Sequence, residues 1–585
     1  SVYGTGNPVA LLKDYGHIRN VYGTLLADLS IRQDLSALTK GLAAEASVSF
    51  DNIGGMNETT NKEYRYMNSN ASITSDGTLV TTPAIYGTDS ETLGHTQPFE
   101  RLMLRSDFQA KVDYNRTFGK HQVGGALIYD MQSVVKNGRN NSQKNQSVLV
   151  NATYTYDNRY SLNAVFNRSG SAYLPDGDKY SNYPAVSAAW IVSNEAFMEK
   201  VTPINLFKIR ASYGLSGWDG NLSHELWRQS YGSGGAGYNF GVNAGGQSGG
   251  SEGDLPVIGL VAEKSQKATF GFDLAAFDNR LNATVEGFYE KRSDILVSGA
   301  NSTSGIIGIT VGQVNEGIYK YKGLDASLSW NDKIGDFHYG IGASMSYLNT
   351  EVVNVNQAYQ EYDYLYTKGN RIGQMYGLEA IGFFNSQQEI NNSPQQTFSD
   401  VAPGDVKYKD QNGDNRIDEK DVVKMFGSSV PRFYFGFNLN FSYKRLELSA
   451  DFQGMTGVTV SLLNSPLYSP LVSNGNISNT FLNEEISWTP ENKTNATMPR
   501  LTTQENLNNY RASSLWYRDG SFLKLRNLLV AYTFPKSQTR FADLKVFVQG
   551  TNLFSLDNIH FADPEQLGIA YPSTRSYWAG IKLNF

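Results

Sequence analysis

The sequence predicts an all-β fold, a transmembrane antiparallel β-barrel, and three observations lead to this prediction. Apolar and polar residues alternate along many segments, and successive side chains of a strand point to opposite faces. The 585 residues include 56 Gly and 36 Tyr, a composition that favours many strands and turns. The connections between the segments are alternately short and long, as the two rims of a membrane barrel require.

The final segment, Thr574 to Phe585, shows the alternation clearly. One face carries only apolar residues, which are Tyr577, Ala579, Ile581, Leu583 and Phe585. The other face is mostly polar, and Trp578 is its one apolar exception. Such a strand fits a barrel whose outside meets lipid and whose inside meets water.

The clearest hairpin runs from Phe433 to Gln453. One face of its returning strand is polar and includes Glu447 and Asp451. Burying unpaired carboxylates in a dry core would be strongly unfavourable, whereas a wide, water-filled barrel keeps them solvated. We therefore expect Leu448 to face lipid and Ser449 to face a wet lumen.

The connection lengths set the predicted strand order. Counted back from the C-terminus, long connections are expected at 52–99, 217–257, 292–318, 385–430, 458–518 and 555–573. The order needs a weakly marked strand near 358–368 and an inner turn near Gly369 and Asn370, and it places a hairpin from Asn61 to Thr74 inside a loop. About 19 strands result, the first near 17–32, and about three more would give the 22 strands of plugged transporters.

Bulk composition excludes several classes of protein. No run of about 18 apolar residues exists, so no transmembrane helix is expected. A net charge of -6 gives no reason to expect a nucleic-acid partner. Cys is absent and the six His residues are scattered without metal-ligand spacing, so the sequence predicts no enzyme. The opening residues show neither Met nor a signal peptide, and we expect them to follow a longer N-terminal region.

One local motif has the spacing of a calcium-binding loop. From Asp410 onward, oxygen-bearing side chains stand at positions 1, 3, 5, 9 and 12, and position 7 would offer its backbone carbonyl. These positions are Asp410, Asn412, Asp414, Arg416, Asp418 and Asp421. A Ca²⁺ ion held there would be structural. The alternative is an Asp/Asn/Gly-rich turn whose carboxylates accept hydrogen bonds and hold no metal.

Aromatic residues in the largest predicted outer loop are candidates for contact with a ligand or a partner. They are Tyr468, Trp488, Trp516 and Tyr517. Their rings could stack on a sugar or a peptide, or they could pack against a partner protein or the loop itself. The sequence favours neither interpretation. The adjacent acids Glu484 and Glu485 would point in different directions and are interpreted as solvated loop charge.

Several longer segments carry a resemblance to a known family. The run PGDVKYKDQNGDNRIDEKD (403–421), followed by PRFYFGFNLNFSYKRLELSADFQG (431–454), resembles the SusC/RagA family of TonB-dependent outer-membrane transporters. Further segments agree in the same order, namely SWTPENKTNATMPRL (487–501), LWYRDGSFLKLRNLLVAYTFPKS (515–537) and the ending YPSTRSYWAGIKLNF. The resemblance therefore covers most of the chain.

The resemblance implies a 22-stranded barrel with long extracellular loops, in the outer membrane of a Gram-negative, Bacteroidota-like bacterium. It also implies a plug domain, a TonB box, a SusD-like surface lipoprotein acting as a lid, and import of oligosaccharides or peptides driven through TonB. Residues 1–585 would be the barrel portion, without signal peptide, TonB box, plug and first strands. The alternatives are a scaffold subunit of a larger outer-membrane complex, a diffusion porin, and a soluble carbohydrate-binding sandwich.

Overall fold

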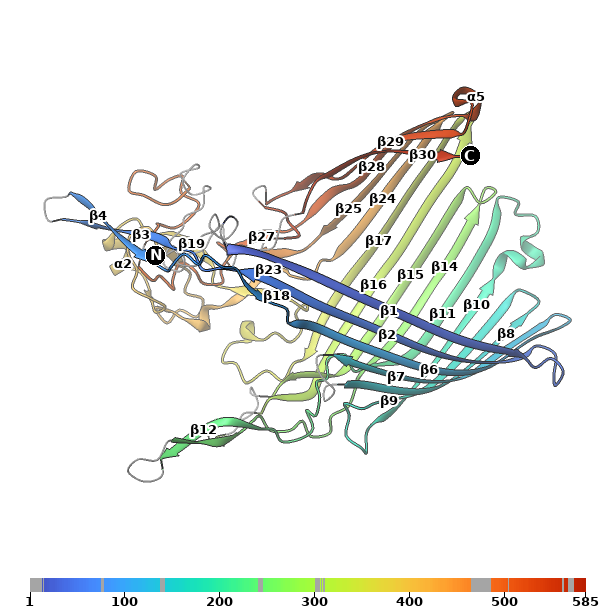
Figure 1. Cartoon of the computed structure of the whole chain (residues 1–585), viewed down its shortest axis with the longest axis horizontal. Coiled ribbons are helices and arrows are strands. Elements are labelled where there is room, and N and C mark those ends of the chain that lie inside the picture. The colour runs from blue at the N-terminus through green and yellow to red at the C-terminus, as the bar shows by residue number, and fades with distance from the viewer. Residues whose placement is uncertain are drawn as a thin grey trace.

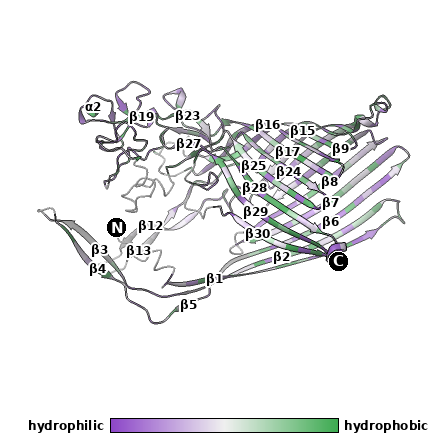
Figure 2. Ribbon diagram, turned by 90° about the horizontal axis from the view of Figure 1, so that it is seen from above, coloured by the Kyte–Doolittle hydropathy of each residue, from purple (hydrophilic) through white to green (hydrophobic). Residues whose placement is uncertain are grey.

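The fold is dominated by one antiparallel sheet of 18 strands. The computed structural model describes residues 13, 15–74, 78–136, 142–239, 246–299, 306, 308, 311–463, 486–502, 504–559, 562–566 and 573–585. Strands that follow one another in the chain lie side by side, and the sheet curls around, as Figure 1 and Figure 2 show. A curled antiparallel sheet of this size is the wall of a large barrel.

Seventeen long strands make up the wall, and a short strand, β5 (Gly94–Thr96), extends it beside β2. The first nine are β1 (Gly16–Asp34), β2 (Leu42–Asn61), β6 (Phe99–Phe118), β7 (His121–Lys136), β8 (Ser142–Tyr156), β9 (Tyr160–Ser171), β10 (Tyr180–Ile191), β11 (Ile204–Trp218) and β14 (Glu263–Ala276). The others are β15 (Leu281–Ser298), β16 (Gln313–Ile334), β17 (Phe337–Asn354), β24 (Phe433–Tyr443), β25 (Leu446–Thr456), β28 (Phe522–Phe534), β29 (Asp543–Asp557) and β30 (Ser576–Asn584).

The connections separate by length onto the two ends of the sheet, as the sequence predicted. One end has tight turns such as those joining β8 to β9 and β24 to β25, where Asp157 (φ 53) and Lys444 (φ 56) adopt the left-handed conformation. Left-handed residues suit two- and three-residue hairpin loops. The other end carries the long connections, including 219–262, 355–432 and 457–521. This asymmetry is typical of outer-membrane barrels.

The apolar side chains of the wall lie on its outer, convex face and are exposed. Val112, Leu127, Val150 and Phe166 lie side by side across four strands and are between 43% and 51% exposed. The alternating residues of these strands, such as Asn151, are less exposed, because side chains on the concave face of a curled sheet converge and cover one another. Continuous exposed apolar rows of this kind mark contact with an apolar medium.

Aromatic rings collect where the strands meet the short turns. Tyr160 stacks on Trp190 with 6.5 Å between ring centroids, and Phe277 lies 5.8 Å from Trp330. Further pairs at this end are Phe337 with Phe441 and Tyr532 with Phe534. Aromatic girdles mark the water–lipid boundary of transmembrane barrels. Among the described helices, including α2 (Gln387–Asn391) and α5 (Lys536–Thr539), none is long and apolar enough to cross a membrane.

The strand predicted near 358–368 is wrong. β17 pairs directly with β24, so residues 355–432 form one connection and the predicted inner turn at Gly369 and Asn370 lies within it. Within this connection, the Tyr364 hydroxyl donates to the Lys420 carbonyl oxygen (2.7 Å). The sheet therefore has 18 strands against the predicted 19 or so, one of them the three-residue β5.

Two long connections carry hairpins of their own. The hairpin expected from Asn61 to Thr74 is present but shifted, and it consists of β3 (Tyr66–Ile73) and β4 (Leu79–Tyr86). A second one, β12 (Tyr231–Asn239) with β13 (Gly246–Glu252), also extends away from the sheet in Figure 1. Both hairpins lie at the end of the long loops.

Connections 355–432 and 457–521 fold against each other, and together they are called the loop pair below. Their short strands pair two by two. The pairs are β18 (Gln374–Gly377) with β23 (Val423–Ser428), β19 (Ala380–Phe383) with β21 (Val406–Tyr408), β20 (Gln395–Gln396) with β22 (Arg416–Ile417), and β26 (Thr459–Ser461) with β27 (Tyr517–Asp519). The loop pair is therefore folded structure at one end of the wall.

Candidate functional site

The concave face of the β24–β25 hairpin is polar, as the sequence predicted. Ser449 lies opposite Asn440, and its hydroxyl donates to the Asn440 Oδ1 atom (2.7 Å). Leu448 lies opposite Phe441 on the other face and is 37% exposed. The strand register thus places Leu448 and Ser449 on opposite faces of the wall, as the sequence predicted.

Charged residues continue this polar face across β11, β14 and β15. The Asp273 carboxylate lies 3.3 Å from the Lys208 ammonium and 3.4 Å from the Arg210 guanidinium. Thr284 donates to the same carboxylate (3.1 Å), and Arg210 also pairs with Glu286. All four charged side chains remain partly exposed, so water can complete their solvation. A wall lined in this way suits a passage for polar solutes.

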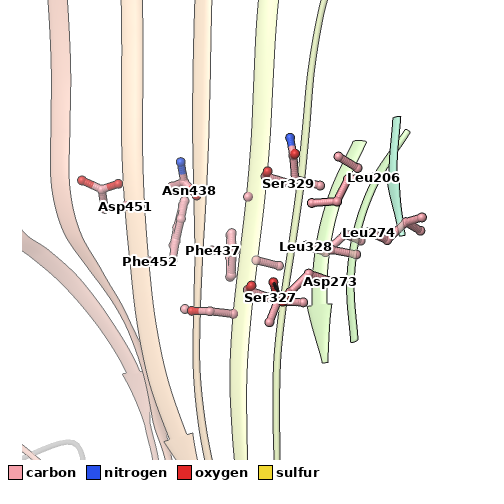
Figure 3. A pocket seen from close by; sticks show the side chains of 18 residues that line it. Leu206, Asp273, Leu274, Ser327, Leu328, Ser329, Phe437, Asn438, Asp451 and Phe452 are labelled. Carbon is pink, nitrogen blue, oxygen red and sulfur yellow. Dashed lines mark hydrogen bonds between the residues drawn. The ribbon is translucent and has the colours of Figure 1, made fainter. Parts of the chain in front are cut away.

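A hollow of about 670 Å³ spans β11, β14, β15, β16, β17, β24 and β25. Figure 3 shows its labelled side chains in rows that cross the strands. Asp451, Asn438 and Ser329 form one row, Phe452, Phe437, Leu328 and Leu274 the next, and Ser327 and Asp273 follow. Its volume lies in the range of small-molecule sites. The carboxylates of Asp273 and Asp451 and the amides of Asn282 and Asn438 offer hydrogen-bond acceptors and donors to a ligand's hydroxyl and amide groups.

The loop pair has an apolar core of its own. Leu378, Val406, Tyr408 and Ile417 are almost fully buried, and Leu515 from the second connection packs against them. Burial raises the pKa of Tyr408, and its hydroxyl donates to the Asn508 carbonyl oxygen (2.7 Å). This core joins the two connections, because its members are separated by about a hundred residues of sequence.

A single buried carboxylate, Asp405, connects the two halves of the loop pair. Arg500 donates to both carboxylate oxygens, from Nε (2.7 Å) and Nη2 (3.1 Å). The amides of Asn506 (3.0 Å) and Asn509 (2.9 Å) donate to Oδ1, and the backbone N–H of Ala402 donates to Oδ2 (2.7 Å). Asp405 is 0% exposed. A buried charge is stable only with partners of this kind.

Two of the aromatic candidates of the sequence, Trp516 and Tyr517, pack inside the loop pair. Trp516 is fully buried, stacks on Tyr510 (5.4 Å between centroids) and donates from Nε1 to the Asn509 carbonyl oxygen (2.8 Å). The Tyr517 hydroxyl donates to the Tyr376 carbonyl oxygen (2.7 Å). These contacts correspond to packing of the loop itself, one of the two interpretations that the sequence left open.

The other two candidates differ. Trp488 is 7% exposed, and its ring lies so close to Gly404 that a Cβ there would come within 2.4 Å of it. Gly404 also has a φ of 94°, a conformation that glycine tolerates best. Tyr468 lies outside the described residues, and its role as a contact to a ligand or a partner stays a prediction.

The calcium-like motif folds as a tight, hydrogen-bonded loop. Asp410 accepts from the backbone N–H groups of Gly413 (2.7 Å) and Asn415 (2.8 Å). The buried Asp421 accepts from Gln411 (2.7 Å) and Asp418 (2.9 Å). Asn412, Asp414 and Asp418 accept from the backbone N–H groups of Asp414, Arg416 and Lys420.

This arrangement bears on both interpretations of the motif. The oxygen atoms that accept these hydrogen bonds have further lone pairs, and hard oxygen ligands are the ones that Ca²⁺ prefers. Within the described ranges, however, no three Asp, Glu or His side chains gather closely enough to hold a metal. The geometry is that of the hydrogen-bonded turn, and Ca²⁺ binding by the loop from Asp410 to Asp421 stays a prediction.

Comparison with known proteins places this architecture. No protein-family model matches the chain. It is 28% identical over 461 residues to TonB-dependent receptor P26 of Formosa agariphila, across 74% of this chain and 45% of that receptor. It is 22% identical over 465 residues to TonB-dependent receptor SusC of Bacteroides thetaiotaomicron, across 74% of this chain and 43% of SusC. The chain is related to the SusC-like TonB-dependent receptors.

The fold agrees with this relationship. The structure of the RagAB peptide transporter matches the structure of this chain with a TM-score of 0.71. The two are 17% identical in sequence, and the match covers 97% of this chain and 62% of the RagAB chain. The chain spans about half the length of the curated relatives it matches. It is an outer-membrane β-barrel, and the resemblance described from the sequence is confirmed. These relatives are receptors and not enzymes, in agreement with the sequence.

Sequence reasoning missed two features of this SusC-like barrel. The first is the aromatic girdle. Its signal in the sequence is an aromatic residue on each side of a short turn, as with Tyr156 and Tyr160, and the same pattern recurs at other short turns. The Asp405 cluster had no sequence signal, because Arg500 and Asn509 lie 95 and 104 residues away. Only the folded loop pair brings these residues together.

Proposed function

We propose that this chain forms the barrel of a SusC-like importer, which takes up oligosaccharides or peptides across the outer membrane with energy supplied through TonB. The observation that carries the proposal is the pairing of an exposed apolar face with a charged concave face. A soluble sandwich would bury its apolar rows, whereas here Leu127 and Val150 are about half exposed. The RagAB neighbour is described as a peptide transporter, which supports this substrate class without selecting it over oligosaccharides.

The loop pair supports a partner at the outer end of the barrel. Its apolar core and the Asp405 cluster make it a folded platform, and a SusD-like surface lipoprotein would find there a surface that changes little on docking. TonB would act through a segment outside this sequence. The outer edges of β1 and β30 have no partner among the described strands, and the proposal includes further strands and a plug that complete the barrel.

Growth of a strain that lacks the gene tests the proposal. An importer predicts loss of growth on one class of oligosaccharide or peptide as sole carbon source, and equal growth on glucose. The same loss is expected when TonB is inactivated, because import needs the proton motive force. A diffusion porin would keep its uptake without TonB. A scaffold in a larger outer-membrane complex would give a defect that does not depend on the solute, and that result would overturn the proposal.

A further inference from the structure

A second hollow, of about 610 Å³, lies where the outer ends of β17, β24 and β25 meet the loop pair. It is separate from the hollow of Figure 3, and the two share no lining residue. Three of its lining residues are cations, namely Arg371, Lys424 and Arg432. They come from the first connection of the loop pair and from the residue that precedes β24.

The cations of this hollow have no acidic partner among the described residues. Arg371 is held by one hydrogen bond, from Nη2 to the Val430 carbonyl oxygen (2.8 Å). Its Nε atom is buried and has no hydrogen-bond partner. A buried guanidinium N–H without an acceptor is unfavourable, so the Nε donor of Arg371 is left unsatisfied by the described residues.

The two acids that line the hollow are engaged elsewhere. Glu351 lies 4.0 Å from Lys320 on β16. Asp519 accepts hydrogen bonds from the Ser521 backbone N–H (2.9 Å) and from the Asn558 amide (3.1 Å). Among the described residues, neither acid therefore forms an ion pair with a cation of the hollow.

Arg371 and Arg432 line the same hollow and carry charges of the same sign. Burial lowers the pKa of Arg371, and the charge of Arg432 lowers it further. Two guanidinium groups side by side are stabilised when an anion lies between them and accepts from both. With Lys424, the lining has three cations against the two acids Glu351 and Asp519, and this net positive charge suits an oxyanion.

We propose that this hollow binds a phosphate or sulfate group between Arg371 and Arg432, with Lys424 adding a third positive charge. The group belongs either to a soluble anionic ligand at the mouth of the barrel or to the phosphorylated head group of an outer-leaflet lipid. Both sources present the same tetrahedral oxyanion to the two guanidinium forks. The site is independent of the proposed import function, since a scaffold or a porin could hold the same group.

Binding to the full-length protein, purified in detergent, tests the site with two probes. Inorganic sulfate, followed by calorimetry, represents the soluble source, and lipid A in mixed micelles represents the lipid. We expect Arg432→Gln to weaken binding at least tenfold for whichever probe the wild type binds. Lys368→Gln is the matched control, because this substitution also removes one positive charge. Lys368 is an exposed residue of the same connection and does not line the hollow.

Arg432→Gln is the deciding variant, because the Arg432 side chain makes no hydrogen bond to the described residues whose loss could disturb the fold. Arg371→Gln is a second variant, and heat-modifiable electrophoretic mobility shows whether each barrel is folded. Sulfate binding that is lost in the variant assigns the site to a soluble ligand, and loss of lipid A binding alone assigns it to the membrane. The proposal is overturned if neither probe binds the wild type, or if Arg432→Gln and Lys368→Gln bind equally well.

Discussion

The barrel wall and the loop pair use apolar side chains in opposite ways. On the wall, Leu127 and Val150 are 51% and 45% exposed. In the loop pair, Trp516 and Leu378 are 0% and 1% exposed. The difference follows from the surroundings, since hydrocarbon accepts apolar surface that water excludes. The chain therefore exposes apolar side chains on the wall and buries them in the loop pair, and this change takes place at the outer ends of the strands.

Charged groups show the same contrast. On the concave face of the wall, Arg210 and Asp273 remain partly exposed beside each other. In the loop pair, Asp405 is fully buried and accepts from four residues. On a wall in contact with water, solvent can supply the hydrogen bonds that an ion pair lacks. In a dry core, protein groups must supply all the hydrogen bonds of a buried charge. The two regions should therefore respond very differently to the loss of one charge.

The largest expected effect is in the loop pair. Asp405→Ala leaves the Arg500 guanidinium and two buried amides without their acceptor, and we expect a loss of about 3–5 kcal/mol in local stability. Protease cleavage within 355–432 and 457–521 should accelerate strongly, while heat-modifiable mobility still shows a folded barrel. The exposed Asp400 provides the control, and Asp400→Ala should change little. Simultaneous loss of the barrel would show that the two regions do not fold independently.

A charge on the wall gives the next largest effect, and it depends on the face. Val150 is six residues from Tyr156 at the short-turn end of β8, or about 15 Å along the barrel axis. Val150→Arg should therefore hinder assembly in the membrane by about 2–4 kcal/mol. Asn151→Arg, one residue further on the concave face, should assemble normally. Equal yields of folded protein for the two variants would contradict the assignment of faces.

A smaller effect distinguishes the interpretations of the calcium-like motif. Asp410→Ala combined with Asp414→Ala removes acceptors for three backbone N–H groups, and we expect about 1–2 kcal/mol less local stability. If Ca²⁺ is bound, a chelator should lower the protease resistance of the wild-type loop pair and leave the variant unchanged. Unchanged resistance of the wild type under chelation would support the turn without metal.

The smallest effect is a pH dependence at helix α2. The backbone N–H of Asn385 (2.8 Å) holds the pKa of Glu389 below its ordinary value of 4.5. Burial opposes this shift, and Lys407 (3.0 Å) adds to it. A carboxylate with a lowered pKa stabilises the fold above that ordinary value, and the contribution is lost as the pH falls through the lowered pKa. Thermal unfolding followed by tryptophan fluorescence between pH 5.5 and 3 should show it, at roughly 0.2–1 kcal/mol.

The variant Glu389→Gln is the matched control for this pH dependence. It keeps the size of the side chain and removes its charge, so the difference between wild type and variant should shrink steadily below pH 4.5. A difference that stays constant or grows on acidification would contradict the assignment to Glu389.

Local alternation predicted the wall because strands repeat every two residues. The hairpin from Phe433 to Gln453 and the directions of Leu448 and Ser449 follow from that period alone. The strand expected near 358–368 came instead from the order of long and short connections, and it is absent. There Tyr362 and Tyr364 stack on each other (5.3 Å between centroids), and Tyr364 binds a carbonyl 56 residues away. Alternation therefore identified wall strands, whereas the count of connections added one strand in a segment whose structure is decided by distant contacts.

The candidate site was only partly visible in the sequence. The polar concave face could be predicted, because Glu447 and Asp451 stand at alternating positions of a strand. The burial of Trp516 could not be predicted, because the sequence of a long loop does not distinguish an exposed aromatic residue from a packed one. The hollow lined by Arg371 and Arg432 likewise needs the fold, since those residues lie 61 positions apart.

The central claim is that hydrocarbon surrounds the wall while water reaches its concave face. The chain has no Cys, so single cysteines introduced at Val150 and Asn151 can be labelled without background. The measurement is the rate at which a charged, membrane-impermeant thiol reagent modifies each variant in outer-membrane vesicles. We expect Asn151→Cys to react at least tenfold faster than Val150→Cys, because thiolate forms in water and not in lipid. Equal rates, or faster reaction at position 150, would contradict the account.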